Sequence, residues 1–260
     1  MTIREFDRRS IGGRWLVSAL VQLRLAASFL TILPVGGDEA AAADVARSFA
    51  WFPLIGFAIG GALSLEDWLL AFLFTRVVRS ALIVLTLEAI SGAVHLDGLA
   101  DTTDALGAGR DRMRALEIMR DSRIGTFGAA TIFFVLVLKI AAIGFTGGGR
   151  RRLALYIAPG LARWAMVAVP YKFSYLREHG AGSALIGERD TPNLRGATII
   201  VLAALIAVPG WIVLRALIVA AAMILIIRVF YKAWLGGVTG DMIGAAGELV
   251  EAAIMIAIAG

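Results

Sequence analysis

The sequence predicts an all-α, polytopic integral membrane protein: a helical bundle with about seven transmembrane helices plus an N-terminal interfacial helix. Hydrophobic residues make up 59% of the 260 positions and charged residues only 17%, whereas a soluble domain has about 45–50% and about 25%. The mean hydropathy is +0.82. Many apolar residues also fall in runs close to the roughly 20 residues that cross a bilayer as a helix. We therefore expect a single integral membrane domain over residues 1–260.

The apolar runs define the expected helices. The earliest stretch, 15–33, contains Gln22 and Arg24, so it is predicted to be an amphipathic helix in the membrane interface rather than a span. Glycines within the later runs, such as Gly56 and Gly60, would allow neighbouring helices to approach closely in lipid. The predicted spans are 50–74, 77–97, 127–146, 152–170, 197–214, 216–235 and 242–259.

The distribution of Lys and Arg predicts the orientation of the bundle. If the chain starts inside and crosses at each run, most of the 25 cations fall on the inner side, as the positive-inside rule requires. The cluster 150–152 is an exception, because it falls outside. This topology places three polar connections on the inner face, namely 98–126, 171–196 and 236–241.

The residue types that are missing exclude several kinds of site. The chain has no cysteine, which excludes disulfides, thiolate metal sites and a cysteine nucleophile. His95 and His179 are the only histidines, too few for a zinc cage. A metal would therefore be held by carboxylates, which favours a hard cation such as Mg²⁺ or Mn²⁺. The P-loop and dinucleotide-binding glycine patterns are also absent.

Three aspartates with helical spacing stand at the inner end of the second run. Asp97, Asp101 and Asp104 occupy positions i, i+4 and i+7, which fall within about 60° of one helix face. Carboxylates this close repel one another unless a cation lies among them, so we predict that they bind a metal. Solvated acids at a helix end are the alternative. His95, just before them, is a candidate for orienting a carboxylate or for a structural hydrogen bond.

A second polar group opens the last run. Thr239 is a candidate N-cap, and the helix start behind it would face an anion. Asp241 could complete the metal site. Glu248, seven residues later, is a candidate catalytic group because an ionisable side chain within a span is costly. Glu248 could instead pair with Lys139 or Arg163.

Two arginines follow the aspartates in the connection 98–126. Arg120 and Arg123 flank a turn into the next run, where two guanidinium groups could bind a diphosphate. Carboxylates that bind metal, beside paired arginines, are the components of a phosphoryl-transfer site. Residues 98–126 are therefore predicted to form an inner-face catalytic loop. Arg110 and its neighbours could instead bind anionic lipid headgroups.

Five stretches of the chain resemble the cobalamin synthase family, the membrane adenosylcobinamide-GDP ribazoletransferases of bacteria and archaea. They occur in the family's order and span nearly the whole chain. Ala105, where the family usually has glycine, and a short segment 106–111 depart from the pattern. The five are FLTILPV at 29–35, FPLIG at 52–56, HLDGLADTTD at 95–104, EIMRDSRIGTFG at 117–128, and TGD at 239–241 with Gly244, Ala245 and Glu248.

The resemblance implies a reaction in the assembly of the nucleotide loop of vitamin B12. The ribose hydroxyl of α-ribazole, or its 5′-phosphate, attacks the cobinamide-linked phosphate of adenosylcobinamide-GDP; GMP leaves, and adenosylcobalamin or its phosphate forms. The resemblance also implies Mg²⁺ dependence and a location in the bacterial inner (cytoplasmic) membrane, with the active site on the cytoplasmic side. The lipid bilayer is then a partner, nucleic acid is not, and assembly into a homo-oligomer is left open.

The residues that would perform this reaction come from the three inner connections and the last run. The metal would neutralise the diphosphate and stabilise the departing GMP oxygen, and a carboxylate, Asp104 or Glu248, would accept the proton of the attacking hydroxyl. The candidates are Asp97, Asp101, Asp104 and Glu248 as catalytic residues, Arg120, Arg123, His95 and Thr239 for substrate binding, and Asp97, Asp101, Asp104 and Asp241 for the metal.

Two other functions share some of these features. A CDP-alcohol phosphatidyltransferase also uses a membrane cluster of aspartates, but its D-x₂-D-G-x₂-A-R spacing has paired acids before the glycine and a following arginine. The segment from Asp97 to Asp101 has neither. A secondary transporter would need charges along a path through the membrane, whereas these acids gather at one face and the half-chains show no repeat.

Overall fold

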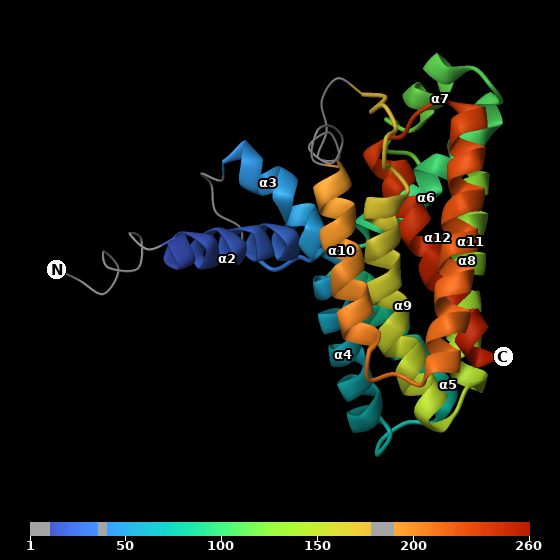
Figure 1. The fold of residues 1–260 in the computed structure, drawn as a ribbon. Helices are drawn as coiled ribbons and strands as arrows, with labels where there is room; N and C mark the ends of the chain where they lie inside the picture. The colour runs from blue at the N-terminus through green and yellow to red at the C-terminus, as the bar shows by residue number, and fades with distance from the viewer. Residues whose placement is uncertain (1–10, 36–40, 178–189) are drawn as a thin grey trace.

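The computed structural model describes residues 11–35, 41–177 and 190–260, and only the backbone at 11–15 and 190. His179 lies outside the described residues. Every regular element of the described part is an α-helix or a short 3₁₀ helix (η) (Figure 1). In chain order they are α2 (Ile11–Leu30), α3 (Ala42–Ser48), η1 (Phe49–Trp51), α4 (Phe52–Leu70), α5 (Arg76–Ile90), α6 (Val94–Asp104), η2 (Ala105–Ala108), α7 (Arg112–Ile118), α8 (Thr126–Phe145), α9 (Gly148–Ala168), α10 (Asp190–Leu205), α11 (Gly210–Trp234) and α12 (Gly240–Ala259).

The long helices form a membrane-embedded bundle. Figure 1 shows α4, α8, α9, α10, α11 and α12 side by side, with α6 and α7 at one end of the bundle. By length and composition, four segments of the described chain can cross a membrane: Ala42–Leu70, Thr126–Phe145, Gly210–Trp234 and Gly240–Ala259. A fifth crossing results if α5 and α6 count as one broken span. The all-helical membrane class is thus confirmed, whereas the predicted number of seven spans is not.

The second predicted span is wrong as a continuous helix. The run 77–97 is interrupted after Ile90, and the axes of α5 and α6 differ by 88°. Gly92 and Ala93 cause the turn, because both have positive φ angles, 63° and 57°, which end a right-handed helix. The Ile32 N–H donates to the Ile90 carbonyl at 2.8 Å. A carbonyl at the C-terminal end of α5 thus has a hydrogen-bond partner from a distant part of the chain. Hydropathy alone does not reveal such a break.

Two other predicted spans also have different limits. The run 197–214 does not form one helix, because α10 ends at Leu205 and α11 begins at Gly210, directly after Pro209. The proline ring fixes φ and removes the N–H that would continue α10. The run 152–170 corresponds to α9, which carries four arginines and buries most of its side chains among its neighbours. Protein rather than lipid therefore surrounds much of α9.

Glycines set the distance between α4 and α9 as predicted. A Cβ on Gly56 would collide with the Pro159 carbonyl, and one on Gly60 would lie 2.5 Å from the Tyr156 carbonyl oxygen. Helices in lipid associate largely through close packing, so these positions require glycine. Gly61, one residue further, has nothing within 4 Å of its Cβ position.

The predicted N-terminal helix is present, displaced toward the N-terminus. The expected segment 15–33 appears as α2, which extends sideways from the bundle in Figure 1. On its exposed side, Leu16 and Leu20 are 59% and 60% exposed. On the other side, Gln22 Nε2 donates to Asp44 Oδ1 at 2.9 Å and holds α3 against α2. The helix is amphipathic, and its apolar side is free to enter lipid.

Candidate functional site

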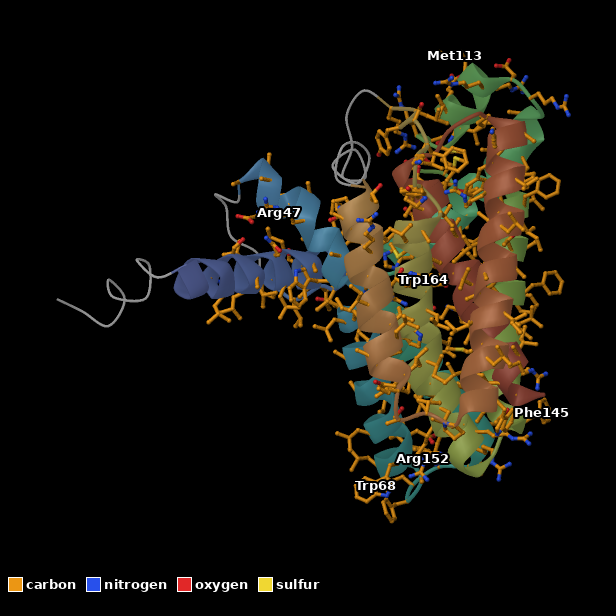
Figure 2. All side chains as sticks on the ribbon, in the orientation of Figure 1. Arg47, Trp68, Met113, Phe145, Arg152 and Trp164 are labelled. Carbon is orange, nitrogen blue, oxygen red and sulfur yellow. The ribbon has the colours of Figure 1, made fainter. Side chains whose placement is uncertain are left out.

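The three polar connections meet at one end of the bundle, as the sequence predicted. The Leu176 N–H donates to the Val238 carbonyl at 2.9 Å, and the Val238 N–H donates to the Ser174 carbonyl at 3.0 Å. The segment after α9 therefore runs beside the segment before α12. Figure 2 shows Met113 of α7 at this same end, whereas Trp68, Phe145 and Arg152 lie at the other end. The middle of the second connection, 178–189, lies outside the described residues.

Further contacts join the connection before α8 to the other two. Arg177 Nη2 donates to the Met119 carbonyl at 3.1 Å, and Trp234 Nε1 donates to the Gly109 carbonyl at 2.6 Å. Each bond crosses from the α6–α8 region to a segment that is distant in sequence. One site can therefore draw on all three connections.

The aspartates of α6 face the start of α12. A Cβ on Gly98 would lie 2.8 Å from the Asp241 carbonyl oxygen and 2.9 Å from its Cα, so the two backbones touch. Asp101 consequently lies in the electrostatic field of Asp97, Asp104 and Asp241. The predicted convergence of acids from two distant stretches is thus present in the structure. Asp97 is exposed, while Asp101 and Asp104 are half-buried.

Asp104 has contacts that the sequence did not predict. Its Oδ2 accepts a hydrogen bond from the Gly125 N–H at 2.7 Å, and its Oδ1 accepts one from the Gly128 N–H at 2.8 Å. A Cβ on either glycine would collide with this carboxylate. Asp104 therefore caps α8 from a different helix, where the helix dipole also favours a negative charge. The metal-ligand role of Asp104 stays a prediction.

Thr239 and Asp241 open α12. Thr239 is the N-cap, as predicted, and its Oγ1 accepts a hydrogen bond from the Met242 N–H at 3.2 Å. Thr239 is fully buried, so this hydroxyl does not face a substrate. Asp241 remains 22% exposed at its side chain, and its Oδ2 pairs with Arg177 at 2.5 Å.

The two arginines proposed to bind phosphate lie in the turn between α7 and α8. Both are exposed. The Arg123 guanidinium pairs with Asp121 at 2.6 Å, and this hydrogen-bonded pair lowers the pKa of Asp121 to about 2. Arg123 would therefore have to break its ion pair with Asp121 before it could bind a phosphate. Arg120 is exposed to solvent in the same turn.

Glu248 belongs to a buried ion cluster instead of the aspartate group. Its Oε2 accepts a hydrogen bond from Lys139 Nζ at 2.5 Å, and the same ammonium donates to Glu88 at 2.9 Å and to Glu251 at 2.7 Å. Glu251 also pairs with Arg163. The alternative prediction, that Glu248 pairs with Lys139, is confirmed. Glu248 lies about 10 Å along α12 from Asp241 and is buried, so its contacts do not support the catalytic role predicted for it.

The carboxylates of this cluster resemble a metal site in their spacing alone. Oxygens of Glu88, Glu248 and Glu251 lie within 4.8 Å of one another. However, the Lys139 ammonium donates to all three and already supplies the positive charge that a metal would bring. The cluster is therefore a structural ion network that ties α5, α8 and α12 together.

His95 lies on the side of the buried cluster. It is only 5% exposed, and a Cβ on Gly244 of α12 would lie 3.2 Å from its Cα. The charges that act on it are those of Arg163, Glu251 and Lys139. This position supports a structural role, the alternative kept open from the sequence, rather than contact with a substrate.

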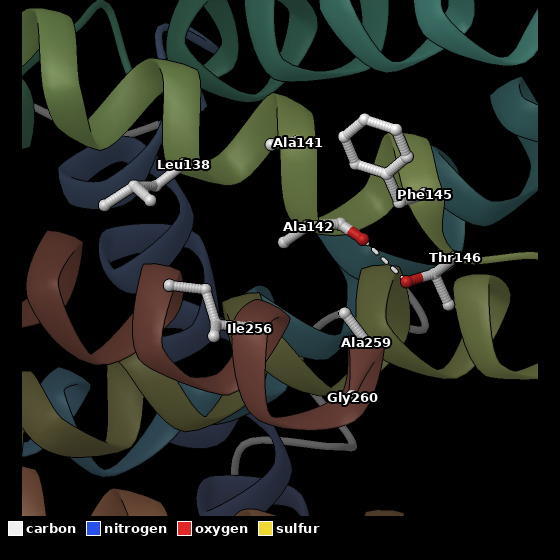
Figure 3. Close-up of a pocket in the computed structure, with 8 residues that line it drawn as sticks. All are labelled: Leu138, Ala141, Ala142, Phe145, Thr146, Ile256, Ala259 and Gly260. Atoms are coloured by element: carbon white, nitrogen blue, oxygen red, sulfur yellow. Dashed lines mark hydrogen bonds between the residues drawn. The ribbon is translucent and has the colours of Figure 1, made fainter.

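The described chain also has an apolar hollow far from the aspartates. It has a volume of about 370 Å³ and lies between the C-terminal ends of α8 and α12 (Figure 3). Its polar feature is Thr146, whose Oγ1 donates to the Ala142 carbonyl at 2.6 Å. No charged side chain lines it. Both helices start at the aspartate end, about 30 Å away, so this hollow has no part in phosphate chemistry.

The carboxylates at the aspartate end are of the type that binds a hard divalent cation, although among the described residues only Glu88, Glu248 and Glu251 bring three such oxygens within 4.8 Å of one another. Asp97, Asp101 and Asp241 bring carboxylate oxygens, the donors that Mg²⁺ prefers, and Asp97 is open to solvent. Like charges held together also favour a bound cation. Arg177 is the residue of this site that sequence reasoning missed, because a single arginine in a loop has no spacing that would distinguish it.

Comparisons with known proteins identify similar chains. The family model described as cobalamin-5-phosphate synthase matches residues 22–259. The adenosylcobinamide-GDP ribazoletransferase of Desulforamulus reducens is 34% identical, covering 88% of this chain and 92% of the relative. The same enzyme of Citrobacter koseri is 39% identical over 89% and 96%, and that of a Roseiflexus species 37% over 86% and 83%. No solved structure matches the chain.

Proposed function

The chain belongs to the cobalamin-5-phosphate synthase family, and from this premise we propose that it is an adenosylcobinamide-GDP ribazoletransferase. It joins α-ribazole, or α-ribazole 5′-phosphate, to the cobinamide phosphate of adenosylcobinamide-GDP and releases GMP. The observation that supports this most directly is the contact between Gly98 and Asp241, which brings acids of α6 and α12 to one place beside arginines.

The metal in this proposal is Mg²⁺ held by Asp97, Asp101 and Asp241. When bound, it would supply charge neutralisation for the diphosphate and for the departing GMP oxygen. Asp104 acts beside this group by holding the start of α8 through Gly125 and Gly128. That contact positions the turn that carries the two exposed arginines.

The other side chains bind and activate the substrates. Arg120 and Arg123 bind phosphate oxygens, which guanidinium groups contact through parallel N–H donors. Asp97 is the exposed carboxylate of the group and accepts the proton of the attacking hydroxyl. Glu248 and His95 do not enter this scheme, because both are buried away from the aspartates.

The proposed location is the bacterial inner membrane, with the aspartate end in the cytoplasm. Exposed cations at that end support this orientation, and α2 then lies in the interface with its apolar side in lipid. The exposed cations are Arg110, Arg112, Arg114, Arg120 and Arg123.

The test is GMP release by purified membranes that contain the protein. Adenosylcobinamide-GDP plus α-ribazole should yield GMP, EDTA should stop the reaction, and added Mg²⁺ should restore it. Membranes without the protein provide the control. If GMP does not appear with either α-ribazole or its phosphate in the presence of Mg²⁺, the proposed activity is wrong.

A further inference from the structure

Arg177 joins two parts of the candidate site. Its Nη2 donates to Asp241 Oδ2 at 2.5 Å and to the Met119 carbonyl at 3.1 Å, so it links the start of α12 to the end of α7. Its positive charge also acts on Asp101. Only 17% of its side chain is exposed. The guanidinium is therefore next to the acids that are proposed to bind the metal.

The backbone holds Arg177 in this position. The two hydrogen bonds between Val238 and the segment 174–176 fix the residues just before it. Gly237 strengthens this contact, because a Cβ there would lie 2.5 Å from the Ser174 carbonyl oxygen. Arg177 thus differs from the exposed arginines of the α7–α8 turn, because hydrogen bonds hold the backbone just before it beside the start of α12.

The guanidinium has an unused donor. Arg177 Nε is buried and has no hydrogen-bond partner among the described residues. Leaving a buried donor of a charged group without a partner is energetically unfavourable. Arginine presents several N–H groups in one plane, an arrangement that fits phosphate oxygens. A phosphate oxygen beside the acids would give this donor a partner.

A metal ion and Arg177 would use the same carboxylate. Asp241 Oδ2 accepts the hydrogen bond from Arg177, and the charges of Asp241 and Arg177 both act on Asp101. A divalent cation at these acids repels the guanidinium and competes for that oxygen. A diphosphate bound to such a cation would bring negatively charged oxygens near the Arg177 guanidinium.

We propose that Arg177 is a substrate-binding residue that exchanges partners: it pairs with Asp241 before Mg²⁺ binds there, and it then binds an oxygen of the diphosphate. The inference rests on the proposed function, which supplies the diphosphate. Arg177 thereby couples the two binding events. Arg177 disfavours binding of the metal alone and favours binding of the metal together with a diphosphate.

The test measures binding by the purified full-length protein in detergent or nanodiscs. Mn²⁺ serves as the metal probe, followed by electron paramagnetic resonance, and the Mn²⁺–pyrophosphate complex serves as the diphosphate probe, followed by calorimetry. In Arg177→Gln we expect Mn²⁺ alone to bind at least about threefold more tightly, because its competitor is gone. We expect the Mn²⁺–pyrophosphate complex to bind about tenfold or more weakly, because a charged hydrogen bond is lost.

Two further variants separate this role from a structural one. Arg112→Gln removes an exposed arginine of α7 and should leave both affinities unchanged. Arg177→Lys keeps the charge without the planar group and should retain thermal stability while it loses part of the pyrophosphate affinity.

The opposite signs of the two effects make the proposal falsifiable. If Arg177→Gln weakens Mn²⁺ and pyrophosphate binding together, or leaves pyrophosphate binding unchanged, Arg177 is structural and the proposal is overturned. Neither measurement requires a corrinoid or a ribazole. The expected pattern without any GMP release would therefore contradict the proposed reaction and leave the role of Arg177 standing.

Discussion

Gly98 of α6 lies directly against Asp241 of α12, with 2.8 Å between the Cβ position of the glycine and the carbonyl oxygen of the aspartate. This contact joins two segments more than 140 positions apart in the chain. It brings a carboxylate of the last helix to the aspartates of α6. The candidate site therefore depends on the absence of a side chain at one position.

Gly98→Ala should separate α6 from the start of α12. The added methyl group meets backbone rather than a flexible side chain, so the helices must move apart, at a cost of about 1–3 kcal/mol. We expect lower thermal stability, weaker Mn²⁺ binding and loss of GMP release. Gly107→Ala, where nothing lies within 4 Å, is the matched control. Equal Mn²⁺ affinity in the two variants would contradict the predicted contact.

Asp101→Ala should abolish transfer without unfolding the protein. Removal of one proposed metal ligand should lower the rate of GMP release about 100-fold or more, and excess Mg²⁺ should not restore it. Membrane insertion and helix content should match those of wild type. Glu66→Ala, which removes a carboxylate of α4 outside the candidate site, should retain activity. Near-normal turnover of Asp101→Ala at saturating Mg²⁺ would refute the assignment.

Asp104→Ala should loosen the start of α8. Two backbone N–H groups, those of Gly125 and Gly128, lose their acceptor, which costs about 1–2 kcal/mol for a lost cap. Hydrogen–deuterium exchange should increase in the first turn of α8, and Asp104→Asn should give a smaller increase. If Mn²⁺ affinity falls in Asp104→Ala while exchange stays at the wild-type level, Asp104 is a metal ligand rather than a cap.

Lys139→Met should be among the most destabilising single changes in the bundle. It leaves Glu88, Glu248 and Glu251 buried together without the ammonium that they share. Breaking a buried ion pair by removing one partner costs about 3–5 kcal/mol, which thermal unfolding in detergent would show as a large drop in Tm. Lys232→Met, at an exposed position of α11, controls for the loss of a lysine. A Tm of Lys139→Met equal to that of the control would contradict the ion network.

Adjacent glycines of α4 offer a second matched pair. Gly60→Ala pushes against the backbone of α9 at Tyr156, whereas Gly61→Ala meets nothing within 4 Å. We expect Gly60→Ala to lower Tm by several degrees, as about 1–3 kcal/mol of strain implies. Gly61→Ala should leave Tm unchanged or raise it slightly, because alanine favours the helix. A lower Tm for Gly61→Ala than for Gly60→Ala would contradict the packing of α4 on α9.

The sequence by itself determined the class of the fold and the local elements of the site. Composition and apolar runs predict membrane helices because a bilayer demands long apolar segments. Helical spacing places Asp97, Asp101 and Asp104 on one element, and the cap at Thr239 follows from a local rule. All of these depend on residues within one or two helical turns of one another, and such information is present in any short window of the chain.

Only the tertiary structure decided which partner each charged group has. Asp104 binds the start of α8, Glu248 binds Lys139, and Asp241 binds Arg177. The break at Gly92, stabilised by the Ile32 N–H, also depends on a segment far away in sequence. A charged side chain attracts any opposite charge that the packing of the helices brings near it. The spacing of residues along one helix does not specify which other helices will pack against it. The choice of partner therefore follows from how α6, α8 and α12 pack, at glycines that allow their backbones to touch.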